Sequence, residues 1–350
     1  MPYFDYSSCR RNTGYLIGSI AVSIKEGLNI IMKYVFIVNP IAGNDDKEKI
    51  FYRIKSTFRP LDDEMIIEET KQVGDAKRIA TQYAQQYGSD CVIVSCGGDG
   101  TVHEVVNGIA GTDTPMMILP LGTGNDFAKK IYNTKNINVE NVIKSFGFYN
   151  GNIKYDIKPI DVIDYNGEKG INVLSFGVDT LVETTGRKIA QRLPFLGHNA
   201  YKVAIVPVLT HSLHYTISYS FNCVDKQTGR EFTVEQSNKD YALLAICNAS
   251  WYGGGFCPAP NSVLDDGLLD VCVIDGISIS QTAKLLPRYA KGDVNEANCD
   301  VCSNYYIKSA RVYMEDGSAL IGNCDGENFN YSDVTITVEP KAVKLCVIKD

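Results

Sequence analysis

The chain has 350 residues, of which 45% are hydrophobic and 21% are charged, so it is long enough for two domains that each bury a core. Its formal net charge of −7 argues against nucleic acid as a partner, because nucleic-acid binding depends on clustered Lys and Arg. The eleven cysteines are scattered, several of them within apolar runs, which is typical of reduced thiols in a cytoplasmic protein.

The first 31 residues resemble a signal peptide only superficially. Arg10 and Arg11 precede a modest apolar stretch, Tyr15–Ile24, which is too short to span a membrane. Met32 stands immediately before a strong candidate for a first strand, Tyr34–Val38. We therefore expect residues 1–31 to be an extension upstream of the natural start.

Strands and helices are predicted to alternate from Met32 to about residue 156. Such alternation, with helices of about a dozen residues, is typical of βαβ units and predicts an α/β domain with a parallel sheet and flanking helices. The predicted strands are Tyr34–Val38, Met65–Thr70, Cys91–Ser95 and Met116–Leu119, and the predicted helices are Asp46–Phe58, Asp75–Tyr87, one that begins at Thr101 and one that follows Phe127.

Three glycine-rich turns follow three of these strands. They are Asn39–Asn44, Gly97–Gly100 and Leu121–Phe127. Ligands of parallel sheets bind at the carboxyl ends of the strands, and glycines let backbone N–H groups approach a phosphate there. Asp99 and Asp126 cannot bind phosphate themselves, so the turns predict a magnesium–nucleotide site. The spacing fits neither a dinucleotide fingerprint nor a P-loop.

Short strands dominate after about Asn150 and predict a separate, mainly antiparallel domain. An acidic turn, Ser262–Asp270, is expected to be a hairpin turn, with cation binding as the less favoured interpretation. Glu327 would be a candidate general base if it lay near a phosphate. The predicted strands are Ile160–Tyr165, Ile171–Gly177, Tyr215–Asn222, Glu231–Glu235, Tyr241–Asn248, Leu268–Ile274, Tyr306–Met314 and Val334–Val338, with helical stretches at Leu181–Thr210 and Ser280–Ala290 and a last segment, Ala342–Ile348, that is expected to return to the first domain.

Five motifs in this order resemble the diacylglycerol/sphingosine kinase catalytic family, which includes bacterial lipid kinases. The resemblance runs from about Met32 to the end of the chain. The motifs are NPxAG at Asn39–Gly43, GGDGTVHEVVNG at Gly97–Gly108, LGTGNDF at Leu121–Phe127, LDDGLLD at Leu264–Asp270 and DGE at Asp325–Glu327.

This resemblance implies two domains, an α/β nucleotide half and a mainly antiparallel β-sandwich half, with ATP held in the cleft between them. Residues 32–156 would form the nucleotide-binding α/β domain, to which a strand at about 340–350 returns. Residues 157–339 would form the β-rich domain that takes the lipid substrate.

The resemblance also implies roles for individual residues. Glu327 matches a glutamate proposed as proton acceptor in diacylglycerol kinases, whereas sphingosine kinases assign that role to the aspartate of the glycine turn, here Asp99. A structural magnesium is implied at the Asp266 side chain, with backbone oxygens near Val263 and Leu268. The implied magnesium and water network comprises Asp99, Asp126, Asp161 and Asp325, and the implied ATP contacts are Asn39, Pro40, Ile41, Ala42, Gly43, Thr70, Gly97, Gly98, Asp99, Gly100, Thr101, Val102, His103 and Thr123.

The expected function is that of an ATP- and Mg²⁺-dependent lipid kinase that transfers the γ-phosphoryl group to a lipid hydroxyl. Diacylglycerol is the favoured acceptor, with a sphingoid base or another lipid alcohol left open. Alternatives are an NAD-kinase-like enzyme that phosphorylates a soluble nucleotide and a non-catalytic nucleotide-sensing module.

We expect a cytoplasmic protein that makes transient peripheral contact with the inner face of the membrane, and a homodimer is left open. Arg187, Lys188 and Arg192, beside Leu193–Leu196, form a basic and apolar stretch that suits anionic lipid. A solvated helix face is an equally good interpretation of this stretch.

Overall fold

The computed structural model describes residues 32–43, 49, 52, 56, 65–134, 137–146, 153–192 and 213–349. Three predicted segments lie partly or wholly outside these residues. They are the N-terminal extension 1–31, most of the predicted helix Asp46–Phe58, and the stretch of Leu181–Thr210 that follows Arg192.

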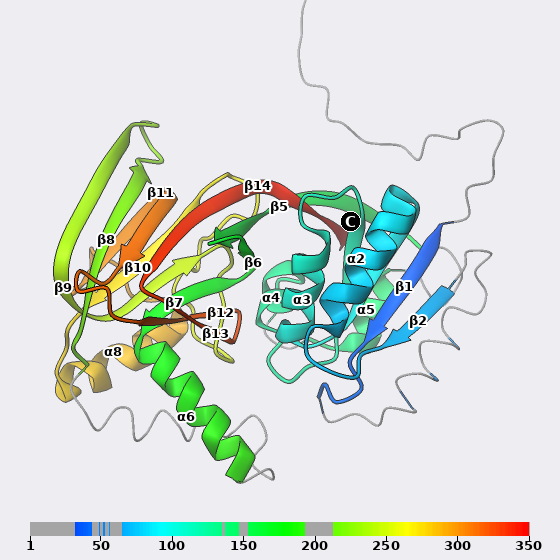
Figure 1. Ribbon diagram of the computed structural model, residues 1–350, viewed down its shortest axis with the longest axis horizontal. Helices are drawn as coiled ribbons and strands as arrows, with labels where there is room; N and C mark the ends of the chain where they lie inside the picture. The colour runs from blue at the N-terminus through cyan, green and yellow to red at the C-terminus, as the bar shows by residue number, and fades with distance from the viewer. Residues whose placement is uncertain are drawn as a thin grey trace, which may run out of the picture. The chain divides into compact units, whose positions relative to one another are not determined.

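The first half of the chain contains the predicted parallel sheet. Strands β1 (Lys33–Val38), β2 (Met65–Glu69), β3 (Cys91–Gly97) and β4 (Pro115–Pro120) lie in the order β4-β3-β1-β2 and pair in parallel. Figure 1 shows β1 and β2 side by side at the edge of this sheet. β3 is buried along its whole length, as expected for an apolar parallel strand covered on both faces.

Helices cover both faces of this sheet. α2 (Asp75–Tyr87) and α3 (Asp99–Ile109) share one buried cluster with the sheet, and α5 (Val139–Ser145) shares the other. α3 begins at Asp99 rather than at Thr101. α2 and α3 approach closely because of Gly108, since a Cβ there would lie 2.7 Å from a carbonyl oxygen of α2. The short elements η1 (Gly88–Asp90) and α4 (Asp126–Ile131) complete this half.

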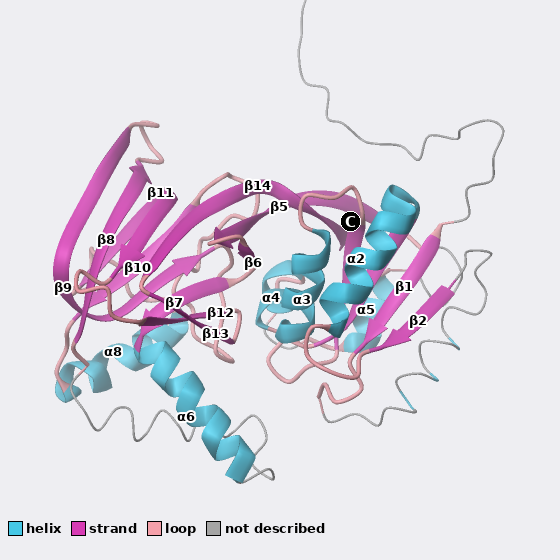
Figure 2. Cartoon of the chain, viewed as in Figure 1, coloured by secondary structure: helices cyan, strands magenta, loops and turns pink. Residues whose placement is uncertain are grey.

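The second half is mainly antiparallel, as predicted. Among its described residues strands predominate, as Figure 2 shows, and helices α6 (Val178–Arg192) and α8 (Ile279–Lys291) accompany them. The inner side chains of these strands share one buried cluster, so the sheet folds over its own core. The strands are β5 (Tyr155–Tyr165), β6 (Glu168–Gly170), β7 (Val173–Gly177), β8 (Tyr215–Val224), β9 (Glu231–Cys247), β10 (Leu269–Asp275), β11 (Cys302–Tyr313), β12 (Leu320–Cys324), β13 (Glu327–Tyr331) and β14 (Asp333–Ile348).

Several predicted boundaries in this half were wrong. The segments Glu231–Glu235 and Tyr241–Asn248 form the single strand β9, because β8 pairs with the polar residues between them. The short strands β6, β12 and β13 were not predicted. In β12 and β13 glycine and asparagine interrupt the apolar alternation on which a strand prediction depends.

Strands β14 and β5 run through both halves of the molecule. The first part of β14 pairs with β11, its last part pairs in parallel with β4, and β5 accompanies it along both parts (Figure 1). The two segments predicted at Val334–Val338 and Ala342–Ile348 are therefore one strand. The pairing shifts register between Glu339 and Val343, where Lys341 has a positive φ of 55°.

Asp161 of β5 holds this irregularity in place. Its carboxylate is fully buried and accepts hydrogen bonds from the backbone N–H groups of Lys341 at 2.8 Å and Gly267 at 2.7 Å. Its own N–H donates to the Leu264 carbonyl at 2.6 Å. The hydrogen bonds of Asp161 thus connect β5 both to the site of the register shift in β14 and to the acidic turn.

No helix in the described part of the chain is both long enough and apolar enough to cross a membrane.

The substitution Asp161→Ala should lower the free energy of unfolding by roughly 3–6 kcal/mol, because two hydrogen bonds to a buried carboxylate are lost at about 1.5–3 kcal/mol each. Urea denaturation measures the change. The matched control is Asp156→Ala on the same strand, since the carboxylate of Asp156 is exposed and lies 3.8 Å from Lys349. Its loss should cost less than about 1 kcal/mol. Equal losses for the two variants would contradict this role of Asp161.

Candidate active site

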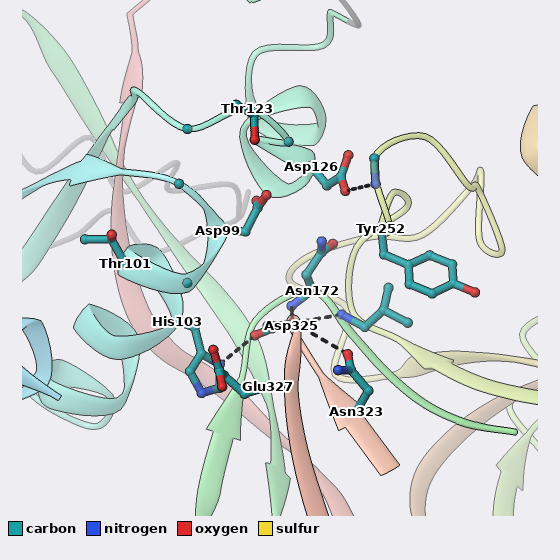
Figure 3. Close-up of a pocket in the computed structure, with 18 of the residues that line it drawn as sticks. Asp99, Thr101, His103, Thr123, Asp126, Asn172, Tyr252, Asn323, Asp325 and Glu327 are labelled. Atoms are coloured by element: carbon teal, nitrogen blue, oxygen red, sulfur yellow. Dashed lines mark hydrogen bonds and ion pairs between the residues drawn. The ribbon is translucent and has the colours of Figure 1, made fainter. Parts of the chain in front are cut away.

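A cavity of about 1300 Å³ is lined by residues from both halves of the molecule (Figure 3). One end is polar and contains the residues of the glycine-rich turns. The other end is an apolar arm formed by α6, α8 and the strands β9 and β10. The polar end includes Asn39–Gly43, Thr70, Gly98–Thr101, His103, Gly122–Gly124 and Asp126, and the apolar arm includes Val178, Val182, Leu213, Leu243, Ile274, Ile277, Leu285, Leu286 and Tyr289.

The three glycine-rich turns meet at the polar end, as the parallel sheet predicts. The N–H groups of Leu121 and Gly122 both donate to the Gly97 carbonyl, at 2.9 and 3.2 Å. A Cβ on Gly122 would lie 2.4 Å from the Cα of Gly98, and a Cβ on Gly43 would lie 2.2 Å from the Leu121 carbonyl oxygen. The turns therefore approach so closely that only glycine fits at these positions.

Asp99 and Asp126 bring two carboxylates to the same end of the cavity. A Cβ on Gly124 would lie 2.9 Å from Oδ2 of Asp99 and 3.9 Å from Oδ2 of Asp126. Burial, the nearby charge of Asp126 and, to a smaller extent, that of Asp325 raise the pKa of Asp99 to about 6, against the hydrogen bonds that it accepts from the backbone of Asp126 and Phe127. Asp126 accepts hydrogen bonds from Lys129 at 2.6 Å and from the Gly254 N–H at 2.7 Å.

The two carboxylates suit a magnesium ion whose remaining ligands are phosphate oxygens and water. Mg²⁺ is commonly bound by one or two carboxylates together with phosphate oxygens and water. Within the described residues, no group of three or more His, Cys, Asp and Glu side chains could hold a metal ion. A cation at Asp99 and Asp126 would also relieve the repulsion that raises the pKa of Asp99.

Asp325 has a different arrangement from the one expected. Its Oδ1 accepts from the N–H groups of Asn172 and Val173 at 2.9 and 3.1 Å, and its Oδ2 accepts from Ile171 N–H at 2.7 Å and pairs with Nδ1 of His103 at 3.0 Å. A carboxylate offers about four lone-pair positions, and all four are used here. Asp325 therefore positions the strands around the site and is not free to bind a metal.

His103 connects the two halves through this contact. It lies on α3, is 8% exposed, and its Nε2 lies 3.3 Å from Nδ2 of Asn107. Burial lowers its pKa, but the hydrogen bond to Asp325 and the charges of Asp325, Glu327 and Glu168 outweigh burial, so that the pKa is raised above 6.5. His103 lines the cavity where an ATP contact was expected, but its ring already pairs with Asp325.

Glu327 begins β13 and lines the cavity beside His103 (Figure 3). The hairpin turn before it consists of Asp325 and Gly326, which both have positive φ, at 53° and 92°. Asp-Gly is a favoured sequence for such a turn. Asn323 supports the turn by accepting a hydrogen bond from the Gly326 N–H at 3.0 Å.

One residue of the expected magnesium and water network, Asp161, does not line the cavity. The residues of the separate structural magnesium expected at the acidic turn, Val263, Asp266 and Leu268, lie outside the cavity as well. At the acidic turn, Oδ2 of Asp266 pairs with Nζ of Lys226 at 2.9 Å, and Oδ1 accepts from Leu268 N–H at 3.1 Å. The Asp266 carboxylate is thus paired with a lysine, as the Asp126 carboxylate is, and the structural magnesium expected at Asp266 stays a prediction.

Sequence reasoning missed several residues that line the cavity. Asn172, Tyr252 and Asn323 contribute polar groups, and the loop Gly253–Gly255 provides the N–H that Asp126 binds. The run of three glycines was a visible signal for a close backbone approach. No pattern in the sequence indicated Asn172, because its position depends on a distant turn.

The chain is similar to diacylglycerol kinases and YegS-type lipid kinases in both halves. Residues 33–162 match the diacylglycerol kinase catalytic domain, and residues 172–347 match the YegS C-terminal NAD kinase beta sandwich-like domain.

Two relatives and one solved structure illustrate this similarity. A diacylglycerol kinase of Bacillus subtilis is 26% identical over 294 residues, which are 83% of this chain and 88% of the relative. A Shewanella frigidimarina protein named "Probable lipid kinase YegS-like" is 29% identical over 259 residues, 72% of this chain and 75% of the relative. A crystal structure of a diacylglycerol kinase from Bacillus anthracis has a TM-score of 0.61 at 21% identity, covers 91% of this chain and 97% of that chain, and shows the shared fold.

The contact between His103 and Asp325 should make stability depend on pH. The pKa of His103 is higher in the folded than in the unfolded state, so its stabilisation is fully present below about pH 6.5 and is lost as the pH rises through the raised folded pKa. We expect the melting temperature to fall over this range and His103→Gln to remove this component. His214→Gln is the control, since His214 and its partner Asp240 are both about half exposed. An unchanged pH profile in His103→Gln would contradict the assignment.

Proposed function

We propose that this chain, which belongs to the diacylglycerol kinase catalytic family with a YegS-type C-terminal domain, transfers the γ-phosphoryl group of ATP to a hydroxyl group of a lipid. One observation carries the proposal: a single cavity joins the converging glycine-rich turns to an apolar arm. A kinase that phosphorylates a soluble nucleotide requires the glycine-rich turns but does not require the apolar arm.

The polar end of the cavity suits the phosphates of ATP. Backbone N–H groups of glycine-rich turns and the N-terminus of an 11-residue helix, α3, favour negative charge. The residues proposed to contact ATP are those of Asn39–Gly43, Thr70, Gly97–Val102 and Thr123. Gly97 and Val102 do not line the cavity themselves and would act by shaping the turn.

Asp99 and Asp126 are the residues that would hold Mg²⁺. The ion would supply positive charge to the phosphates of ATP. The chain itself positions the two carboxylates, Asp126 through Gly254 N–H and Asp99 through Phe127 N–H.

In the proposed reaction, the bond between the γ-phosphorus and ADP breaks as the bond from the lipid oxygen to that phosphorus forms. The hydroxyl proton passes to a carboxylate. Asp99 has a pKa raised to about 6 in the protein without Mg²⁺, which a bound cation would lower, and Glu327 lies beside His103 at the edge of the same cavity. Both remain candidates for the base.

The apolar arm is the proposed site of the lipid chain. The protein would approach the inner face of the membrane from the cytoplasm. Lys188 and Arg192 of α6 are exposed, as docking on anionic lipid requires, whereas Leu193–Leu196 lie outside the described residues. A homodimer stays a prediction.

Purified protein, [γ-³²P]ATP and Mg²⁺, offered a bacterial lipid extract or NAD, should give labelled product in the organic phase only. Labelled product in the aqueous phase with NAD would instead support a nucleotide kinase. Labelled product in neither phase would support a non-catalytic nucleotide-binding role.

Asp99→Asn should raise the melting temperature of the ligand-free protein at pH 8. The folded pKa of about 6 exceeds the ordinary value of 3.8, so the ionised carboxylate destabilises the fold increasingly as the pH rises between these values. The variant should also lose the increase in melting temperature that Mg²⁺ gives the wild type. A wild-type response to Mg²⁺ that persists in Asp99→Asn would contradict the proposed role.

Glu327→Gln distinguishes the two candidate bases. If Glu327 accepts the proton, kcat should fall by about 10²–10⁴-fold while the Kd for ATP stays within about twofold. The control is Glu296→Gln, because Glu296 is exposed and does not line the cavity. Near-normal turnover of Glu327→Gln would exclude Glu327 and leave Asp99 as the base.

A further inference from the structure

Asn172 carries a buried acceptor without a partner in the wall of the cavity. It is 4% exposed, and its Oδ1 has no hydrogen-bond partner among the residues that the structure describes. Among the described residues, Ser95 Oγ, Asn248 Oδ1 and Glu339 Oε2 are also buried without a hydrogen bond, although Glu339 pairs with Lys169, and none of the three residues lines the cavity. Leaving a buried acceptor unpaired is unfavourable, so an unpaired acceptor in the wall of a cavity indicates that a bound ligand donates a hydrogen bond to it.

The orientation of the Asn172 amide is fixed by its neighbours. Nδ2 donates to the Trp251 carbonyl oxygen at 2.6 Å, and a flipped amide would place two acceptors in contact there. The backbone N–H donates to Asp325, and the backbone carbonyl accepts from the N–H groups of Asn248 and Ala249. Every polar group of Asn172 is therefore engaged except Oδ1.

Asn172 lies where the polar end of the cavity meets the apolar arm. It directly precedes β7, and the next residues along the chain that line the cavity, Val173, Val178 and Val182, belong to the apolar part. Figure 3 shows its amide below the Asp126 carboxylate, on the side of the cavity that also holds Tyr252. A ligand group beside Asn172 would therefore belong to the lipid rather than to the nucleotide, because the glycine-rich turns proposed to bind the nucleotide lie in the other half of the molecule.

We infer that Oδ1 of Asn172 accepts a hydrogen bond from a second donor on the lipid headgroup, next to the hydroxyl that is phosphorylated. This inference rests on the proposed function. The reacting hydroxyl has one proton, which must go to the base, so it cannot also satisfy Asn172. The substrate class is therefore a lipid alcohol with a neighbouring hydroxyl or amine, such as a monoacylated polyol or an amino alcohol.

Charge around the amide favours a donor over an acceptor. Asp99, Asp126 and Glu327 line the same cavity, and Asp325 has no donor to offer because it accepts four hydrogen bonds. A diacylglycerol carries ester oxygens beside its single hydroxyl. These are acceptors, and they would face the Asn172 oxygen without forming a bond.

Matched pairs of lipids test the inference in mixed micelles. In the hydroxyl pair, 1-oleoylglycerol is compared with 3-hydroxypropyl oleate, which has the same chain and reacting hydroxyl but lacks the neighbouring one. In the amine pair, 2-amino-1-octadecanol is compared with 1-octadecanol. Wild-type enzyme should favour the donor-bearing member of at least one pair by tenfold or more in kcat/KM, and the pair that shows the preference identifies the donor.

Asn172→Ala should bring this ratio to within about twofold of one. Ser95→Ala is the control, because Ser95 is a buried side chain with an unpaired oxygen outside the cavity and shares no hydrogen bond with Asn172, and its ratio should equal that of the wild type. A wild-type ratio near one in both pairs, or a ratio that persists in Asn172→Ala, would overturn the inference.

If Asn172→Ala does not fold, the wild-type ratios alone test the inference. A preference of tenfold or more in one pair supports it, and ratios near one in both pairs refute it. If the wild-type enzyme phosphorylates no lipid at all, the proposed function fails. A lipid kinase that shows no preference within either pair refutes only the role of Asn172.

Discussion

The Asp325 carboxylate is the contact on which the geometry of the site depends. It accepts one hydrogen bond from each of the N–H groups of Ile171, Asn172 and Val173 and pairs with His103 of α3. One side chain thus connects the first half of the chain to the start of β7 and to the hairpin turn that carries Glu327. Burying a carboxylate is unfavourable unless it is fully hydrogen-bonded. Because this carboxylate is fully hydrogen-bonded, it holds the surrounding backbone in one position. The same pairing fixes the backbone of Asn172 and thereby the direction of its amide.

A second connection, made by backbone pairing, allows one cavity to serve two kinds of ligand. β14 and β5 continue from the antiparallel half into the parallel sheet, and Asp161 holds the register shift between them. The glycine-rich turns of one half therefore face the apolar arm of the other. Phosphoryl transfer from a soluble nucleotide to a lipid requires this combination. The charged phosphates need a polar site, the lipid chain needs an apolar one, and the two sites must adjoin so that the lipid hydroxyl reaches the γ-phosphate.

Much of the fold could be predicted from the sequence, whereas the contacts within the site could not. Repeated apolar runs predicted the parallel sheet, and the glycine-rich turns predicted where Asp99 and Asp126 would meet, because parallel strands end at one edge. By contrast, the pairing of Asp325 joins residues 152 to 222 positions apart in the chain, which no local pattern indicates. Asp266 could not be assigned either, since its partner Lys226 lies on a hairpin 40 positions away.

The most direct test of the account is a crystal structure with Mg²⁺, a non-hydrolysable ATP analogue and an ether-linked lipid alcohol. We expect the phosphates at the glycine-rich turns and the lipid chain beside Leu243, Ile274 and Leu285 in the apolar arm of the cavity. The headgroup should lie between Asp99 and Glu327. A lipid chain bound elsewhere, with the apolar arm filled only by water, would contradict the account.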